Sequence, residues 1–246
     1  MTVAAVPGAP ATVGGLPVLP VDDFADWGIV AYTTTRDAGT FGSQADEPMA
    51  TVLARWNAVL GDAAARGVGA FATAHQVHGA DIHQHGGGWR GWLRGPDGDG
   101  HLWTRRGHGA AVTVADCVPV FLAHPSGAAA VLHSGWKGTA AGITERAITL
   151  FRGAGLTPAD CRLHLGPAIS GACYEVSPDV LAALGQPAAG GPAPVDLRSI
   201  IADRARALGV RAISTSPWCT RTHAAQLFSH RGGDAGRQIG VLLSLP

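Results

Sequence analysis

Lysine is almost absent from this chain of 246 residues, in which Lys137 is the single lysine. Basic and acidic residues are balanced at 18 each, so the formal net charge is zero, and charged residues make up only 15% of the sequence. A surface that binds nucleic acid or anionic lipid needs a cluster of basic residues, and no basic stripe is visible. We therefore expect neither nucleic acid nor membrane as a partner.

Cysteine is also scarce, and the four cysteines, at positions 117, 161, 173 and 219, form no Cys-X-X-Cys pair. In a chain of this size such spacing favours free thiols or metal ligands over a disulfide framework. The sequence further lacks a cationic start followed by a long apolar run, and no stretch resembles a transmembrane helix. These absences predict a cytoplasmic protein.

Apolar residues, at 46%, suffice for a sizeable core, and the length fits one large domain. Because the start is rich in Ala, Gly and Pro, we predict a flexible tail over 1–19 and a single folded domain over 20–246. Periodicity and capping residues predict helices at 49–60, 139–152, 178–184 and 197–208. Strands and helices mix without a regular βαβ alternation, which favours an α+β fold.

The stretch 84–108 is dense in Gly, Trp and Arg. This composition predicts a long surface loop with one short strand. Its tryptophans, Trp89 and Trp92, either line a cleft or anchor the loop, and anchoring is the more common role.

The most informative stretch runs from Val112 to Thr139. It contains two short apolar runs, 118–124 and 128–133, separated by Pro-Ser-Gly. Two such runs joined by three turn residues predict a β-hairpin.

The register of this hairpin has a chemical consequence. If His124 pairs with Ala128, then His133 lies opposite Pro119, and Cys117 points to the same face as His133. One zinc ion, with bonds of about 2.0 Å to nitrogen and about 2.3 Å to sulfur, can bridge the distance between the Cys117 and His133 side chains. The alternative is a buried cysteine beside a core histidine.

A third imidazole comes from His-Gln-Val-His at 75–78. On a strand His75 and His78 point to opposite faces, and His78, beside the flexible Gly79, is the better candidate. A set of His78, Cys117 and His133 leaves one position open on zinc, which is the pattern of catalytic rather than structural sites.

Gly-Trp-Lys-Gly-Thr, at 135–139, lies between the hairpin and a predicted helix. Glycines let backbone amides face a ligand, a helix N-terminus favours anions, and Lys137 adds a positive charge. The segment predicts a phosphate site at Lys137 and Gly138, and we add Arg36 from a polar loop as a further phosphate contact. A plain tight turn explains the segment equally well.

Six short segments occur in one order along the chain: HQVHG (75–79), ADCVPVFL (115–122), LHSGWKGTAAGI (132–143), GPAISGACYEV (166–176), WCT (218–220) and FSHRGGDAGRQ (228–238). With them the sequence resembles the multicopper polyphenol oxidase or laccase-domain family, now known as purine nucleoside phosphorylases with a zinc site. The resemblance runs from about Thr33 to the C-terminus.

In that family the catalytic metal is held by residues that match His78, Cys117 and His133. The resemblance implies phosphorolysis of adenosine, inosine, guanosine and methylthioadenosine, together with adenosine deamination, so the partners are purine nucleosides and phosphate. It also implies a layered α/β/β/α catalytic domain like that of cytotoxic necrotizing factor. The assembly is expected to be a monomer or a small homo-oligomer.

Two other chemistries remain open. In a copper-dependent polyphenol oxidase, Cys117 and two histidines would hold copper, but the sequence has only two methionines as axial ligands and lacks the several His-X-His pairs of a trinuclear site. In a metal-free hydrolase, Cys117 would be the nucleophile and His133 the base.

Overall fold

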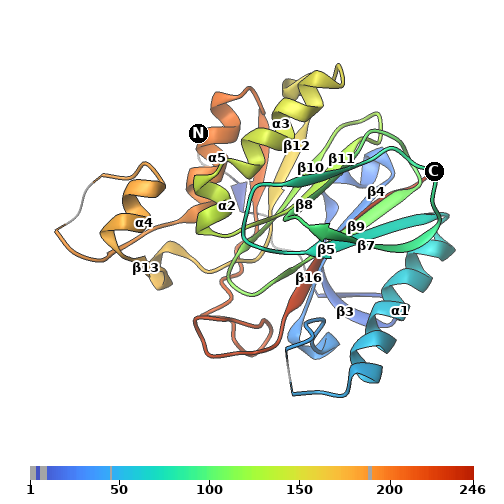
Figure 1. Cartoon of the computed structure of the whole chain (residues 1–246), viewed down its shortest axis with the longest axis horizontal. Helices are drawn as coiled ribbons and strands as arrows, with labels where there is room; N and C mark the ends of the chain where they lie inside the picture. The colour runs from blue at the N-terminus through green and yellow to red at the C-terminus, as the bar shows by residue number, and fades with distance from the viewer. Residues whose placement is uncertain (1–3, 6–9, 45, 188–189) are drawn as a thin grey trace.

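The computed structural model describes residues 4–5, 10–44, 46–187 and 190–246. These residues form two seven-stranded mixed β-sheets that pack face to face, with α1 on one outer face and α2, α3 and α5 on the other (Figure 1). The prediction of one mixed fold of strands and helices is confirmed at this level. The likeness to the cytotoxic necrotizing factor domain stays a prediction.

Sheet A has the strand order β1-β15-β12-β10-β11-β8-β6. Its strands are β1 (Ala4–Ala5), β6 (Ile82–His85), β8 (Gly100–Trp103), β10 (Val118–Ala123), β11 (Ala129–Ser134), β12 (Arg162–Leu165) and β15 (Ala212–Thr215). Parallel and antiparallel pairs both occur, because β12 pairs antiparallel with β10 and parallel with β15.

Sheet B has the strand order β2-β3-β4-β16-β9-β5-β7. Its strands are β2 (Ala11–Val13), β3 (Leu16–Val21), β4 (Ile29–Thr34), β5 (Ala70–His75), β7 (Gly91–Asp97), β9 (His108–Val114) and β16 (Gln238–Ser244). A separate ribbon joins β13 (Glu175–Val176) to β14 (Ala193–Pro194).

The α-helices are α1 (Met49–Ala65), α2 (Trp136–Ala140), α3 (Ile143–Gly153), α4 (Pro178–Ala183) and α5 (Leu197–Ala207). Short 3₁₀ helices occur at Asp22–Trp27, Arg36–Ala38, Pro158–Asp160 and Gly171–Cys173. Within the described ranges, no helix combines the length and the apolar character that crossing a membrane requires.

The centre of the molecule is the space between the two sheets. Phe121 and Val131 from sheet A meet Val112, Leu242 and Ile29 from sheet B in one apolar cluster. Each of these side chains is at most 1% exposed. Burying a side chain of this size stabilises a fold by about 1.5–3 kcal/mol, so the facing strands are held at a fixed separation.

The hairpin prediction is confirmed in its register. β10 pairs antiparallel with β11, and Pro119 lies opposite His133. The backbone N–H of His124 donates to the carbonyl of Ala128 over 2.9 Å. The turn residues Pro-Ser-Gly therefore fix which side chains of the two strands share a face.

The predicted tail over residues 1–19 is wrong for its second half. Residues 11–13 and 16–21 form β2 and β3, and β3 pairs with β4. Val18 is fully buried and Leu19 is 4% exposed, because this short apolar segment packs against the sheet. Residues 1–3 and 6–9 of the predicted tail lie outside the described residues.

The predicted surface loop over 84–108 is also wrong. This stretch contains β7, β8 and the end of β6, and β9 begins at His108. β8 is fully buried because it pairs with both β6 and β11 inside sheet A. Gly91, Gly95 and Gly100 belong to these short strands, whereas the other glycines of the stretch lie in the connections between them.

Two of the predicted helices have boundaries that differ markedly from the observed ones, and in both cases the difference involves a glycine. The α1 helix continues through Gly61 to Ala65. The single helix predicted over 139–152 is two helices, α2 and α3, separated by Gly142 with a φ of 76°. The predicted cap of α5 is confirmed, since the Asp196 carboxylate accepts from the backbone N–H of Arg198.

Candidate metal centre

The three predicted metal ligands come together at the junction of the two sheets. His78 follows β5, Cys117 connects β9 to β10, and His133 lies near the end of β11. Their ligand atoms all lie within 4.8 Å of one another. The rings of His78 and His133 meet edge to face with centroids 4.7 Å apart.

The loop that carries His78 is anchored to β9 by the Gln76 side chain, which hydrogen-bonds to the Thr113 backbone as a neighbouring strand would. The Gln76 amide nitrogen donates to the carbonyl of Thr113 over 2.8 Å, and its oxygen accepts from the Thr113 backbone N–H over 2.7 Å. These two bonds imitate a strand pair between β5 and β9. They place His78, which has a left-handed φ of 61°, beside the end of β9.

Close packing on the other side explains Gly135. A Cβ atom at this position would lie 2.8 Å from the sulfur of Cys117. The residue must be glycine for β11 to approach Cys117 as closely as it does. The sequence motif around 135–138 thus has a steric origin in the metal centre.

One buried acid that sequence reasoning missed contacts this site. The Asp99 carboxylate lies 2.7 Å from Nδ1 of His133, and its side chain is fully buried. It also accepts from the backbone N–H groups of residues 77–79. The single sequence signal was an acid between two glycines ahead of an apolar run, and it gave no hint of these partners.

The charges of the site favour an ionised thiol. Burial disfavours the thiolate of Cys117, but the imidazoles of His133 and His78 outweigh burial and lower the pKa of the thiol. Burial likewise opposes protonation of His133, whereas Cys117 and Asp99 raise the pKa of its ring. Thiolate is the form of cysteine that binds metals, so the electrostatics suit a ligand.

The donor set fits a zinc ion. A thiolate and two imidazoles are preferred zinc ligands, and three protein ligands leave a fourth position open. His78 is exposed while His133 is buried, so the open side of the cluster is the side of His78. Copper binds the same kinds of donor atom.

A cavity of about 750 Å³ includes the three ligands in its lining. This volume lies in the range of pockets that bind small molecules. Four cationic side chains line it and take part in no salt bridge within the described residues: Arg94, Lys137, Arg231 and Arg237. Among the described lining residues, Asp116 is the single carboxylate. The cavity is therefore suited to an anion.

Aromatic side chains also line the cavity. Trp56 and Trp92 stack with ring centroids 5.2 Å apart, and the Trp92 indole donates to the Thr73 hydroxyl over 2.9 Å. Trp92 therefore takes the cleft-lining role left open by the sequence. Trp89 instead packs near His85 and against the core between the sheets.

The predicted phosphate contacts are not brought together. Lys137 lines the cavity, with its ammonium 5.7 Å from the centre of the Trp136 ring. Gly138 is buried, and a Cβ atom there would lie 2.9 Å from the carbonyl of Gly79. Gly138 is absent from the cavity lining, so its contact is with the loop that follows His78.

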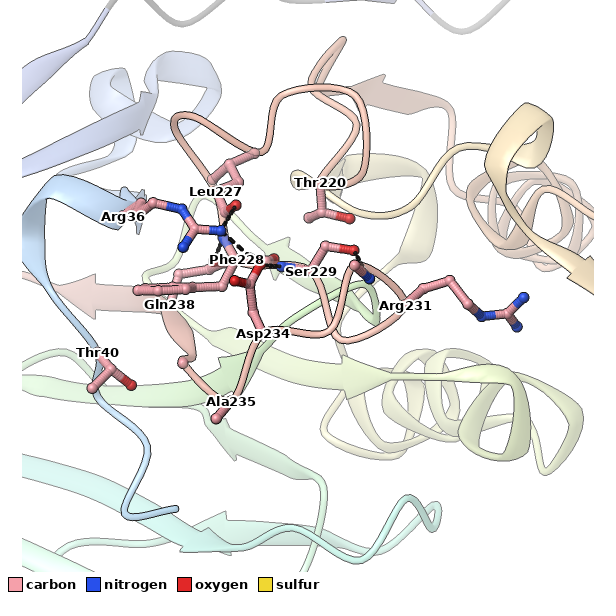
Figure 2. A network of polar contacts seen from close by, with 12 residues as sticks. Arg36, Thr40, Thr220, Leu227, Phe228, Ser229, Arg231, Asp234, Ala235 and Gln238 are labelled. Atoms are coloured by element: carbon pink, nitrogen blue, oxygen red, sulfur yellow. Dashed lines mark hydrogen bonds and ion pairs between the residues drawn. The ribbon is translucent and has the colours of Figure 1, made fainter. Parts of the chain in front are cut away.

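Arg36 has contacts that differ from the predicted one. Its guanidinium lies 2.6 Å from the Asp234 carboxylate and donates to the carbonyl of Leu227 over 3.0 Å. Figure 2 shows Arg36 turned toward this loop, whereas Arg231 extends away from it. Arg36 also lies over the Phe228 ring and does not line the cavity. Its charge is neutralised by Asp234, so it stabilises the loop.

Asp116 and the remaining cysteines have contacts outside the ligand cluster. The Asp116 carboxylate accepts from the Thr220 hydroxyl over 2.5 Å and from the Arg231 backbone N–H over 2.6 Å. It ties the two C-terminal loops to the start of β10. Cys161, Cys173 and Cys219 are free thiols and do not join the metal group.

A two-sheet α/β protein with a His-Cys-His cluster beside a cationic cavity is the class that these observations define. The sequence from 37 to 244 matches the family described as multi-copper polyphenol oxidoreductase laccase, and the chain belongs to this family.

Relatives with curated names point to a more particular activity. A Streptomyces coelicolor protein named purine nucleoside phosphorylase is 34% identical over 229 residues, which cover 88% of this chain and 91% of the relative. Purine nucleoside phosphorylase YlmD from Geobacillus stearothermophilus is 32% identical over 195 residues, covering 70% and 71% of the two chains.

Solved structures share the fold. The crystal structure of Geobacillus stearothermophilus YlmD superposes with a TM-score of 0.87 at 26% identity, covering 98% of this chain and 100% of that chain. Bacillus licheniformis YfiH superposes with a TM-score of 0.79 at 25% identity, covering 93% and 96%.

Proposed function

We propose that this chain is a zinc-dependent purine nucleoside phosphorylase that also deaminates adenosine. The observation that carries the proposal is the His78, Cys117 and His133 cluster in the wall of a cavity lined by cations that form no salt bridge within the described residues. The names of the relatives support the nucleoside as substrate. The expected substrates are adenosine, inosine, guanosine and methylthioadenosine, with phosphate as the second substrate.

The three ligands would hold zinc at the cavity wall. A bound zinc ion supplies a Lewis acid and lowers the pKa of water toward neutrality, which suits attack on C6 of adenine. His133 lies in β11 and Cys117 in the connection between β9 and β10, and all three strands contribute side chains to the core between the sheets. His78 is the exposed member and lies nearest to solvent.

Phosphorolysis needs phosphate held beneath the sugar carbon that carries the base. Lys137 is our leading phosphate ligand, because it lines the cavity and has no carboxylate partner among the described residues. Arg94, Arg231 and Arg237 provide further positive charge along the same lining. These charges attract phosphate and stabilise its negative charge.

Tyr174 is our candidate for contact with the purine. It lines the cavity, and the Arg231 guanidinium lies 5.0 Å from the centre of its ring. Burial raises the pKa of Tyr174 to about 12. The hydroxyl therefore stays protonated near neutral pH, where it can donate a hydrogen bond while the ring packs against a flat base.

Product analysis tests the proposal directly. Zinc-loaded protein is incubated with each of the four nucleosides, with and without phosphate, and the products are separated by chromatography. Free purine that requires phosphate identifies phosphorolysis, and inosine formed from adenosine without phosphate identifies deamination. The absence of both products on fully zinc-loaded protein would refute the proposal.

Copper chemistry is the alternative that the family description favours. Metal analysis of the purified protein and its visible absorbance separate the two cases, because a copper-thiolate site is coloured and a zinc site is not. Oxidation of a phenol by the copper-loaded protein, without nucleoside turnover by the zinc-loaded protein, would replace the phosphorylase proposal.

A further inference from the structure

We infer that Asp99 is a positioning residue that sets two proposed metal ligands at once, through the ring of His133 and the backbone of His78. This inference rests on the proposed zinc site but not on the reaction carried out there. It concerns one carboxylate that joins a loop after β5 to a residue of β11.

The carboxylate accepts from four N–H donors. Oδ1 of Asp99 lies 2.7 Å from Nδ1 of His133 and 3.0 Å from the backbone nitrogen of His78. Oδ2 lies 2.7 Å from the nitrogen of Gly79 and 3.1 Å from that of Val77. Each oxygen therefore accepts two hydrogen bonds, and none of its partners is a cation other than a protonated His133.

The bond to His133 decides which ring nitrogen faces the metal. When the N–H group at Nδ1 donates a hydrogen bond to Asp99, the unprotonated Nε2 is left as the ligand atom. The backbone of His133 is tied to the same residue, since its N–H donates to the Asp99 carbonyl over 2.7 Å. Both the orientation of the ring and its tautomer thus depend on Asp99.

The bonds to residues 77–79 stabilise an unfavourable backbone. His78 has a φ of 61°, a left-handed conformation that a residue with a Cβ seldom adopts. Three consecutive N–H groups converge on Asp99 around this residue, and together they offset the strain. Without that acceptor, the loop would relax and move His78 away from the other two ligands.

The neighbours of Asp99 are shaped for this contact. A Cβ atom at Gly98 would lie 2.4 Å from Nε2 of His83, and one at Gly100 would lie 2.7 Å from Cδ2 of Leu132. Glycine on both sides therefore lets Asp99 enter the space between β11 and the loop after β5. The Gly-Asp-Gly sequence is therefore explained by close packing of the chain on both sides of Asp99 against His83 and Leu132.

Asparagine cannot replace this carboxylate. Its single carbonyl oxygen can serve one pair of donors, while its NH₂ group faces the other pair donor to donor. If the NH₂ group faces His133, the imidazole must present Nδ1 as the acceptor and loses its Nε2 lone pair for the metal. If it faces Gly79 and Val77, the loop must open.

The test is a comparison of metal affinities. Zinc and cobalt(II) are titrated into wild type, Asp99→Asn and Asp97→Asn in competition with a chromogenic chelator, well below the unfolding temperature of each protein. Asp97 is the matched control, because its carboxylate also contacts a histidine Nδ1, that of His75 over 2.8 Å, but is 73% exposed. We expect Asp99→Asn to bind both metals about 10–100-fold more weakly, as for other partners of metal-bound histidines.

Asp97→Asn should match wild type in both affinity and cobalt absorption spectrum, whereas the cobalt spectrum of Asp99→Asn should change because His133 is reoriented. Wild-type affinity in a folded Asp99→Asn would overturn the inference. If that variant does not fold, ¹⁵N NMR of histidine-labelled wild-type holoprotein decides: His133 bound to zinc through Nδ1 would overturn the inference, and a protonated Nδ1 would support it. Failure of nucleoside turnover in the zinc-loaded wild type would refute the proposed function. The comparison of metal affinities would still be valid, because it does not depend on turnover.

Discussion

Two thiols of this chain have lowered pKa values for different physical reasons. For Cys117, burial opposes ionisation, but the imidazoles of His133 and His78 outweigh it and lower the pKa of the thiol. For Cys219, burial opposes ionisation, but hydrogen bonds from Ser170 and Thr222 outweigh it and lower the pKa to about 6. A low pKa alone therefore does not identify a metal ligand. The thiol must also lie within reach of other ligand atoms, as that of Cys117 does.

This difference predicts the behaviour of two matched variants. Cys117→Ala should lose bound zinc and nucleoside turnover together, because two imidazoles alone bind zinc weakly. Cys219→Ala should keep one zinc per chain and most of its turnover. Elemental analysis after dialysis and the product assay check both outcomes. Full zinc content in Cys117→Ala would show that the ligands are other residues.

Lys137 should act on phosphate and not on the metal. Lys137→Ala removes one charge-assisted contact of about 1.5–3 kcal/mol, so the KM for phosphate should rise roughly 10- to 150-fold. Deamination should be spared because water attack needs no phosphate, and zinc content should not change.

The control for Lys137 is Arg146→Ala, which removes a cation from an exposed pair with Asp81 outside the cavity. It should change neither reaction. Equal losses of phosphorolysis and deamination in Lys137→Ala, at an unchanged KM for phosphate, would show that Lys137 supports the fold or contacts the base.

At the scale of elements, the loop that precedes β16 depends on one ion pair. Arg36 and Asp234 are 30% and 26% exposed, and burial opposes ionisation of Asp234 while Arg36 lowers its pKa below the usual 3.8. A carboxyl whose pKa is lowered in the folded state adds stability above its unfolded pKa and loses it as the pH falls. The pair therefore stabilises the protein at neutral pH and less so below about pH 4.

Arg36→Ala should lower the free energy of unfolding at pH 7 by about 1–3 kcal/mol, because it leaves Asp234 without its charged partner. The loss of stability between pH 5 and pH 3 should be smaller than in wild type. Urea unfolding at several pH values measures both effects. The KM for phosphate should stay within about twofold of wild type, and a larger rise would restore Arg36 as a phosphate contact.

Contact between α2 and the loop after β5 can be tested with two glycines. Gly138→Ala places a Cβ atom 2.9 Å from the Gly79 carbonyl, so α2 must move away from the loop that carries His78. Overpacking of this kind costs about 1–3 kcal/mol, and zinc affinity should fall with it.

Gly153→Ala is the control, because a Cβ atom at this end of α3 meets nothing within 4 Å. It should leave zinc affinity unchanged and stabilise the helix slightly. Thermal unfolding and zinc titration of the two variants check the pair. Unchanged zinc affinity in Gly138→Ala would show that α2 and the metal loop are not coupled.

Helices and strands whose formation depends on nearby residues were predictable from the sequence. Strands that depend on pairing with residues distant in sequence were not. The hairpin of β10 and β11 is set by its own turn, and α5 by the cap at Asp196, so both were predicted correctly. β8 is only four residues long and pairs with strands on either side, so nothing within it signals a strand.

The same distinction separates the residues of the site. The three proposed metal ligands were predicted because the hairpin register relates two of them and because all three belong to motifs that resemble a known family. Asp99 was missed because its partners lie 20–22 and 34 residues away, a relation that no local pattern contains. The ion pair of Arg36 with Asp234 was not predicted because the two residues lie 198 positions apart.

At the scale of the whole molecule, the proposed metal lies between the two sheets. His78 follows a strand of sheet B, His133 belongs to sheet A, and Cys117 lies in the crossover from β9 to β10. A bound ion would therefore bridge the two halves of the sandwich in addition to any catalytic role. Binding that occurs only in the folded state must stabilise that state by mass action.

The stabilisation by bound zinc depends on the free zinc concentration relative to the dissociation constant. Free zinc at 100 times its dissociation constant adds about 2.7 kcal/mol, which for a chain of this length corresponds to roughly 5–10 °C in Tm. Zinc-loaded wild type should therefore lose roughly this much on addition of a strong chelator, and should regain it when zinc is restored. Cys117→Ala should unfold at one temperature with or without chelator, because it has no site to empty. Calorimetry of the four samples decides, and an equal chelator effect in both proteins would place the stabilising ion elsewhere in the chain.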